Sequence, residues 1–112
     1  MAKNDLQGTL DLLVLKTLDQ NGALHGYGIV LHIQNASGSM LRVEEGSLYP
    51  ALYRMEEQGL IEAEWRPTSN NRNAKFYALT RKGRRTAQAE LDGWLRLSGT
   101  VARVLRALEQ EA

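Results

Sequence analysis

The chain has 112 residues, a formal net charge of +1 and no cysteine. This length predicts one domain with a modest core, and the lack of cysteine excludes a disulfide framework, a thiolate metal site and a cysteine nucleophile. The start has no basic segment followed by an apolar run, and no stretch approaches about 18 apolar residues, so we expect a cytoplasmic protein that does not span a membrane.

The first predicted element is a helix that ends at Asn21-Gly22. Leucine and valine recur at helical spacing from Leu6 to Leu18, and further leucines widen the apolar surface beyond the stripe of an ordinary surface helix. Glycine at the end takes the left-handed cap conformation readily. The wide apolar surface predicts two buried faces, one within the domain and one against a partner subunit, the latter at Leu10 and Leu13.

A second, short helix is predicted from Gly26 to Ala36, where the Ser37-Gly38-Ser39 run ends the pattern. The side chains predicted on or beside one side of it are Tyr27, Val30, Leu31 and Ile33. Leu41-Arg42-Val43 is then expected to form a brief strand.

A third helix is predicted from Glu44 to Gln58, with Leu48, Leu52 and Met55 pointing into the core because they fall at i, i+4 and i+7. Pro50 lacks an amide donor. Either the helix begins near Gly46 with Pro50 in its first turn, which we favour, or the first turn is distorted. The outward face is predicted to hold Ser47, Pro50, Arg54 and Glu57, with Tyr49 and Tyr53 on a flank.

A hairpin follows Gly59. Ile61, Ala63 and Trp65 alternate with polar residues, which is typical of a half-buried strand, and Trp65 is predicted to lie in the core. Pro67 ends this strand, residues 68–73 have a turn composition, and residues 75–79 return as a second strand. The pattern predicts a small β-hairpin with a polar, cationic tip, the wing of a winged helix-turn-helix.

Thr80 suits the N-cap of a last helix of about 30 residues. Its apolar positions are spaced 4, 3, 4, 3, 4 and 3, like the a and d positions of a heptad. The compact domain leaves them little to pack on, so we expect this seam to form a homodimer interface, with Gly93 and Gly99 weakening the helix and allowing a bend. The seam consists of Ala87, Leu91, Trp94, Ser98, Val101, Leu105 and Leu108.

Charge is distributed unevenly along the chain. Seven lysines and arginines and no acidic residue lie between Arg66 and Arg85, so this segment carries +7 and the rest of the chain −6. Local charge decides where a phosphate backbone docks, so the segment predicts a nucleic-acid surface. The alternative is an ordinary solvated basic surface.

The predicted fold class is therefore mainly α with a small β-hairpin (α+β). Residues 1–79 would form a winged helix-turn-helix DNA-binding domain, and residues 80–112 a long C-terminal dimerisation helix.

Five motifs follow one another along the chain: Gly8-Thr9-Leu10, Leu24-His25-Gly26-Tyr27, the run from Gly46 to Leu52 (GSLYPAL), Gly59-Leu60-Ile61 and Tyr77-Ala78-Leu79-Thr80. In this order they resemble the PadR-like bacterial transcriptional regulators. The resemblance covers roughly Gly8 to Leu108, and the GSLYPAL run is its most specific part. Residues 43–47 together with Ala74-Lys75 are most similar to a short branch of the family common in acidobacteria.

The resemblance implies a homodimer that usually represses transcription and whose last helix swaps against the partner's first helix. The single helix after the wing places the chain with the short members. Some short relatives bind flat, apolar compounds at the dimer interface through aromatic residues of that helix. Trp94 is the only aromatic residue there, so a small apolar or aromatic effector would bind at Trp94.

The predicted function is sequence-specific regulation of transcription, as a repressor bound to a two-fold symmetric operator on double-stranded DNA. The third helix would enter the major groove, and the wing would contact the backbone or the minor groove. The candidate DNA contacts are Ser47, Tyr49, Pro50, Tyr53, Arg54, Asn71, Arg72, Asn73 and Lys75. The candidate dimer contacts are Leu10, Leu13, Leu91, Trp94, Ser98, Val101 and Leu105.

Other interpretations stay open for several of these features. The main alternative function is a winged-helix module that binds a protein without specific DNA binding. For Tyr49 and Tyr53, the alternative to a DNA contact is local packing against the wing. The cations Arg81, Lys82, Arg84 and Arg85 either contact phosphate or aid solubility.

We do not expect an enzyme, a metal or a cofactor. No nucleophile-base pair, phosphate loop or metal-ligand spacing stands out in the sequence. His25 and His32 are seven residues apart and have no evident third ligand, so His25 is interpreted as a capping or packing residue and His32 as a surface residue.

Overall fold

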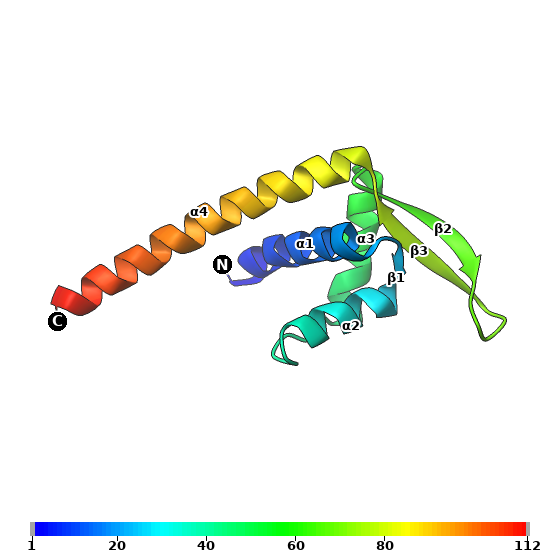
Figure 1. The fold of residues 1–112 in the computed structure, drawn as a ribbon, viewed down its shortest axis with the longest axis horizontal. Helices are drawn as coiled ribbons and strands as arrows, with labels where there is room; N and C mark the ends of the chain where they lie inside the picture. The colour runs from blue at the N-terminus through cyan, green and yellow to red at the C-terminus, as the bar shows by residue number, and fades with distance from the viewer. Residues whose placement is uncertain (1, 112) are drawn as a thin grey trace.

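The computed structural model describes the backbone of residues 2–111 and the side chains of residues 9–111. Its elements are α1 (Ala2–Asn21), β1 (Leu24–His25), α2 (Gly26–Ala36), α3 (Glu45–Glu57), β2 (Ile61–Pro67), β3 (Asn73–Leu79) and α4 (Arg81–Glu111). Helices α1, α2 and α3 pack together, the hairpin β2–β3 projects to one side, and α4 runs alongside α1 and beyond it (Figure 1). The predicted α+β class is confirmed.

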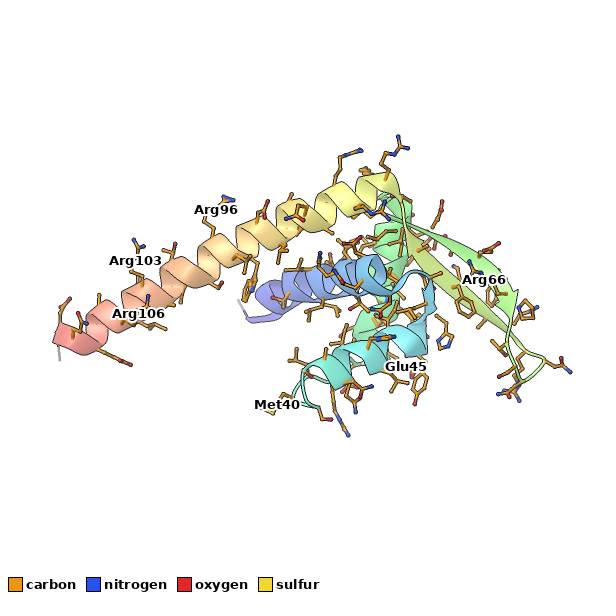
Figure 2. The ribbon with its side chains drawn as sticks, viewed as in Figure 1. Met40, Glu45, Arg66, Arg96, Arg103 and Arg106 are labelled. Carbon is orange, nitrogen blue, oxygen red and sulfur yellow. The ribbon has the colours of Figure 1, made fainter. Side chains whose placement is uncertain are left out.

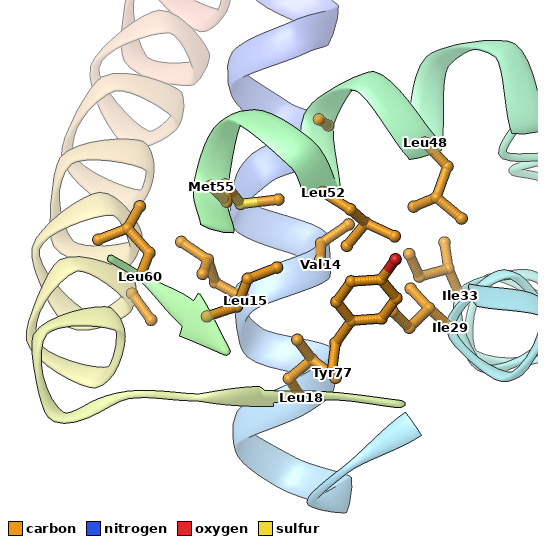
Figure 3. Packing of buried hydrophobic residues seen from close by; sticks show 13 residues of the cluster. Val14, Leu15, Leu18, Ile29, Ile33, Leu48, Leu52, Met55, Leu60 and Tyr77 are labelled. Atoms are coloured by element: carbon orange, nitrogen blue, oxygen red, sulfur yellow. The ribbon is translucent and has the colours of Figure 1, made fainter. Parts of the chain in front are cut away.

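The core lies where α1, α2, α3 and the sheet meet. Leu48, Leu52 and Met55 of α3 are fully buried, as their spacing predicted. Figure 3 shows Leu52 and Met55 toward α1 and Leu48 toward Ile33 of α2. Val14, Leu15 and Leu18 of α1 belong to the same cluster, together with residues of α2, the sheet and α4. Leu12 is also buried but lies outside the cluster, so α1 is covered on two sides within one chain. The side chain of Leu6 lies outside the described residues.

The ends of the first helices follow local chemistry. Gly22 ends α1 with φ +78°, the left-handed conformation that was expected there. Helix α2 has the predicted bounds, and His25 caps it, since the ring Nδ1 accepts a hydrogen bond from the Gly28 amide at 3.0 Å. His32 is exposed, as predicted.

The sheet has one strand more than the predicted hairpin. Its order is β1-β3-β2, all antiparallel, with Leu24 opposite Tyr77 and Ile61 opposite Leu79. β1 has only two residues, too few to show an alternating pattern. The brief strand predicted at Leu41-Arg42-Val43 is wrong, because that segment has no regular structure.

The predicted burial of Trp65 is also wrong. Ile61 is buried and Ala63 partly buried, but Trp65 is 65% exposed although it shares their face of β2. The reason is the length of the hairpin: β2 and β3 extend past the helices, so the outer part of the alternating face has no core beneath it (Figure 1). We call residues 61–79 the wing.

Helix α3 begins at Glu45, next to the predicted start near Gly46. Pro50 is nevertheless the sixth residue of the helix, so the expectation that it lies in the first turn is wrong. The proline leaves the Gly46 carbonyl without its usual intrahelical donor. Gly46 is exposed to solvent, so water can satisfy that carbonyl.

Helix α4 is continuous through Gly93 and Gly99. Ala87 is buried against the domain, whereas Val101, Leu105 and Leu108 are each about half exposed. Arg96 and Arg103 point away from α1, so the apolar stripe lies on the other side of the helix (Figure 2). The last turns of α4 therefore present an apolar stripe that the chain itself does not cover.

Among the described residues, no helix is both long and apolar enough to cross a membrane.

Candidate nucleic-acid interface

The outward side of α3 is exposed, as predicted. Ser47 and Pro50 are exposed, Tyr49 is 43% exposed and Tyr53 is 65% exposed. We call these four residues the recognition face. Ser47 and Pro50 lie roughly opposite the buried Leu48, Leu52 and Met55, with Tyr49 and Tyr53 on a flank, because each residue turns the helix by about 100°. Polar and aromatic side chains near a helix N-terminus are suited to contact base edges.

The tip of the wing is a hydrogen-bonded turn. The Thr68 amide and hydroxyl both donate to the Arg72 carbonyl, at 2.7 and 2.8 Å, and the Asn71 amide donates to the Thr68 carbonyl. Asn71 has φ +62°, which asparagine tolerates better than most residues. The backbone of Asn71 therefore serves the turn, while the side chains of Asn71, Arg72 and Asn73 stay exposed.

A groove of about 660 Å³ lies between the wing and the start of α2. Tyr27, Tyr49 and Trp65 supply aromatic walls, and Asn70 and Lys75 supply polar groups. Tyr49 is held close to α2, because its ring lies so near Gly26 that a side chain there would overlap it. Tyr49 therefore packs locally on α2, whereas the alternative interpretation expected packing on the wing, and it also borders the groove.

Two of the predicted DNA contacts have partners within the chain. Arg54 Nη2 donates to both carboxylate oxygens of Asp11 at 2.6 Å. Lys75 Nζ lies 3.4 Å from Glu56 Oε1 and 5.6 Å from the centre of the Tyr77 ring. The structure thus places Arg54 against α1, off the recognition face, whereas Lys75 stays at the wall of the groove.

The cations at the start of α4 serve structural contacts in two cases. Lys82 Nζ donates to the Gln58 carbonyl at 2.8 Å, which satisfies a backbone group at the end of α3. Arg84 lies 3.3 Å from Asp19 of α1. Thr80 caps the helix as predicted, since its hydroxyl accepts a hydrogen bond from the Gly83 amide. Arg81 and Arg85 are exposed.

Asp19 of α1 lies beside two cations, Lys16 at 3.2 Å and Arg84 at 3.3 Å. The hydrogen bond from Lys16 lowers the pKa of the Asp19 carboxyl below its ordinary value of 3.8, and Arg84 lowers it further, although burial opposes the shift. Within the wing, burial raises the pKa of the Tyr77 phenol above its ordinary value of 10.0.

The predicted dimer contacts lie on two helices. Leu10 and Leu13 of α1 and Leu91 and Ser98 of α4 are partly buried. Trp94, Val101 and Leu105 of α4 are 45%, 46% and 57% exposed, and they share the stripe with Leu95, Leu97 and Val104. This apolar stripe is wider than the heptad seam alone.

Sequence reasoning missed Tyr27 as a surface residue. Tyr27 is 65% exposed at the start of α2, and it borders both the groove and a second hollow of about 400 Å³ beside Arg42, Glu44 and Glu45. The buried residues of α2 are Gly26, Ile29 and Ile33. Their spacing of three and four would have placed Tyr27 outside the core.

An exposed third helix beside a projecting, cation-bearing hairpin defines a winged helix-turn-helix, a DNA-binding fold. Within the described part of the chain, no three histidine or acidic side chains lie close enough together to hold a metal ion.

The chain belongs to the PadR-like family of transcriptional regulators: the family model "Transcriptional regulator PadR-like family" matches residues 14–89. The resemblance that the sequence motifs indicated is thus confirmed. A PadR-like transcriptional regulator from Bacillus cereus has 30% sequence identity, a TM-score of 0.75 and coverage of 89% of this chain and 94% of that one.

Two further relatives extend the comparison. An uncharacterised 37.1 kDa protein in transposon TN4556 of Streptomyces fradiae is 39% identical over 101 residues, which are 90% of this chain and 26% of that protein. The chain thus spans about a quarter of that relative's length. The structure of Bacillus subtilis PadR in complex with operator DNA has a TM-score of 0.64 at 24% identity and covers 73% of this chain and 46% of that one, a likeness of fold.

Proposed function

We propose that this protein is a sequence-specific transcriptional repressor that binds a two-fold symmetric operator as a homodimer. Helix α3 enters the major groove with Ser47, Pro50 and Tyr53 toward the base edges, and Tyr49 lies at the edge of this contact. The wing lies along the neighbouring backbone or minor groove, with Asn71, Arg72, Asn73 and Lys75 near phosphates.

The observation that carries this proposal is the position of the recognition face beside the cationic wing. Tyr49 of α3 and Lys75 of the wing line the same groove, so one surface offers both base-reading and phosphate-binding groups. The likeness to a PadR structure that contains operator DNA supports the same use of this surface. The exposed Arg72 and the three asparagines at the wing tip supply hydrogen-bond donors that suit phosphate oxygens, which favours DNA over a protein partner.

The apolar stripe on α4 supports the homodimer. Leu105 and Leu108 are more than half exposed in one chain, and large apolar patches that stay exposed are typical of interaction surfaces. A partner's α1 and α4 together would cover a stripe of this width, through Leu10 and Leu13 on the first helix and Leu91 to Leu105 on the last. A two-fold dimer then presents two copies of α3 to two half-sites.

Trp94 is the candidate residue for an effector site. It is the aromatic member of the stripe and is 45% exposed in one chain, so two copies near the dimer axis would offer flat apolar walls to a small aromatic compound. Binding of such a compound would change the angle between the two halves and hence the spacing of the two α3 helices.

The test is selection of a preferred duplex from a random DNA library, followed by titration of that duplex and a scrambled one at two salt concentrations. We expect a palindromic sequence with half-sites about one helical turn apart, and affinity that falls steeply as salt rises. Enrichment of no sequence, together with no binding to either duplex at low salt, would contradict the proposal. Reporter expression that rises when the gene is deleted would establish repression.

A further inference from the structure

An ion pair joins the recognition helix to the first helix of the chain. Arg54 of α3 and Asp11 of α1 are 43 residues apart in sequence, yet one guanidinium nitrogen lies 2.6 Å from both carboxylate oxygens. The Arg54 side chain is 40% exposed and the Asp11 side chain 27% exposed. Charge-assisted hydrogen bonds are strong and directional, whereas a partly exposed pair adds little to overall stability. The main effect of such a pair is to fix the orientation of α3 relative to α1.

The pair is one of three contacts at the C-terminal end of α3. Glu56 lies against Lys75 of β3, and the Gln58 carbonyl accepts from Lys82 of α4. Residues 54, 56 and 58 are thus tied to three different elements, whereas Ser47 and Pro50 at the other end of α3 are exposed. The C-terminal end of α3 is therefore fixed by contacts with other elements, whereas its N-terminal end is exposed to solvent.

Asp11 occupies a particular place on α1. In sequence it lies between Leu10 and Leu13, which pack in part against the core of their own chain and which the proposed function assigns to the dimer interface. The partner subunit would therefore contact one side of the turn of α1 that contains Asp11, while Arg54 contacts the other side. If the packing of the two subunits changed, this single turn of α1 would move and would change the position of α3.

We infer that Arg54 is a positioning residue: through Asp11 it sets the angle of the recognition helix relative to the dimer and does not itself contact DNA. This inference rests on the proposed function. A two-fold operator requires two α3 helices at a fixed spacing and tilt, so a small rotation of each helix weakens specific binding and leaves phosphate attraction intact. Arg54 thus contributes to discrimination between sequences.

The experiment compares Asp11→Asn, Arg54→Gln and the double variant with wild type, and uses Arg72→Ala as the reference for a phosphate contact. Each protein is titrated with the library-selected duplex and a scrambled duplex over a series of salt concentrations. Its mass is measured by sedimentation. Hydrogen exchange of the α3 amides in the DNA-free protein gives a readout that needs no operator.

A positioning role predicts a matched pattern. Asp11→Asn and Arg54→Gln should each lower the ratio of selected to scrambled affinity on the order of tenfold, and the double variant should be no worse, because the two residues act as one unit. The salt dependence and the dimer mass should stay unchanged, and the α3 amides should exchange faster. The swapped variant, Asp11→Arg with Arg54→Asp, should restore part of the ratio of selected to scrambled affinity. It remains informative if a single variant folds poorly, because it re-forms the ion pair.

Other outcomes would overturn the inference. If Arg54→Gln alone weakens binding and reduces the salt slope by about one, as Arg72→Ala should, Arg54 contacts phosphate directly. Tighter binding by Asp11→Asn, from loss of a negative charge, would point the same way. If the library yields no preferred duplex, the proposed function fails, and the hydrogen exchange still decides the link: unchanged exchange of the α3 amides in both single variants refutes it.

Discussion

Gly83 at the start of α4 lies directly against the backbone of Leu60, so that a methyl group on Gly83 would overlap the Leu60 carbonyl oxygen. That carbonyl also accepts a hydrogen bond from the Thr80 amide, which joins the start of α4 to the start of the wing. The close approach fixes where the long helix leaves the domain.

We therefore predict that Gly83→Ala destabilises the protein by about 1–3 kcal/mol, because a backbone carbonyl cannot move aside as a side chain can. Thermal or denaturant unfolding measures the change. Gly99→Ala is the matched control, since a methyl group there meets open space, and it should stabilise α4 by up to about 1 kcal/mol. Equal stability of the two variants would contradict the close contact.

Gly26 gives a second, different prediction. A methyl group there would overlap the end of the Tyr49 side chain, which is able to rotate away, so Gly26→Ala should keep the fold but move Tyr49 from its place beside the groove. Affinity for the selected duplex should fall several-fold with little change in unfolding temperature. Gly28→Ala should leave the affinity unchanged and should not lower the unfolding temperature, because its methyl group makes only ordinary contacts with His25 and Leu24. A similar loss of affinity in both variants would count against the role of Tyr49.

The sequence predicted those parts of the fold that a repeating pattern specifies. The i, i+4, i+7 spacing of Leu48, Leu52 and Met55 indicated the buried face of α3 correctly, and the cap at Thr80 followed from residue chemistry. Trp65 was misplaced because alternation distinguishes the two faces of a strand but not how far the core extends beneath it. Nothing local distinguishes the exposed end of such a face from its buried end.

The candidate site was likewise predictable only where a local pattern specified it. The recognition face followed from helical geometry, but the pairing of Arg54 with Asp11 depends on how α3 crosses α1, which neither segment encodes alone. Lys82 and Arg84 likewise looked like free cations in the sequence, although tertiary packing brings them to Gln58 and Asp19.

The wing should supply affinity without sequence preference. Arg72→Ala is expected to weaken binding to selected and scrambled duplexes alike and to reduce the salt slope by about one. Ser47→Ala and Tyr53→Ala should instead lower affinity mainly for the selected duplex. Titrations of both duplexes over a range of salt separate the two effects, and equal losses on both duplexes for all three variants would contradict this division.

Glu56 should restrain Lys75, whose ammonium lies 3.4 Å away. Glu56→Gln is therefore expected to raise affinity for both duplexes a few-fold, because it releases a cation and removes a negative charge beside the groove. Glu109→Gln, near the end of α4 and outside the groove, removes the same charge and is the control. No difference between the two variants would mean that Lys75 takes no part in DNA binding.

The pH dependence of stability should reveal the contact of Asp19 with Lys16 and Arg84. The folded-state pKa of Asp19 is lowered, so its contribution is fully present above the ordinary value of 3.8 and is lost as pH falls through the folded-state pKa. Urea unfolding from pH 6 down to about pH 3 should therefore show a shallower loss of stability for Asp19→Asn than for wild type. Asp92→Asn, at a carboxylate that accepts from the neutral Gln88 amide, should retain the wild-type slope.

A substitution in the apolar stripe on α4 tests the dimer directly, because these side chains are exposed in one chain and contribute little to its folding. Leu105 is 57% exposed in one chain, so Leu105→Asp should leave the fold of each subunit intact, whereas burial of the new carboxylate between subunits would be costly. Thr100→Asp introduces the same residue on the opposite, polar side of the helix and should behave as wild type. Sedimentation at low concentration should show monomers for Leu105→Asp and dimers for Thr100→Asp. Because one subunit reaches only one half-site, Leu105→Asp should also lose most of its preference for the palindromic duplex, and a dimer mass retained in both variants would refute the α4 interface.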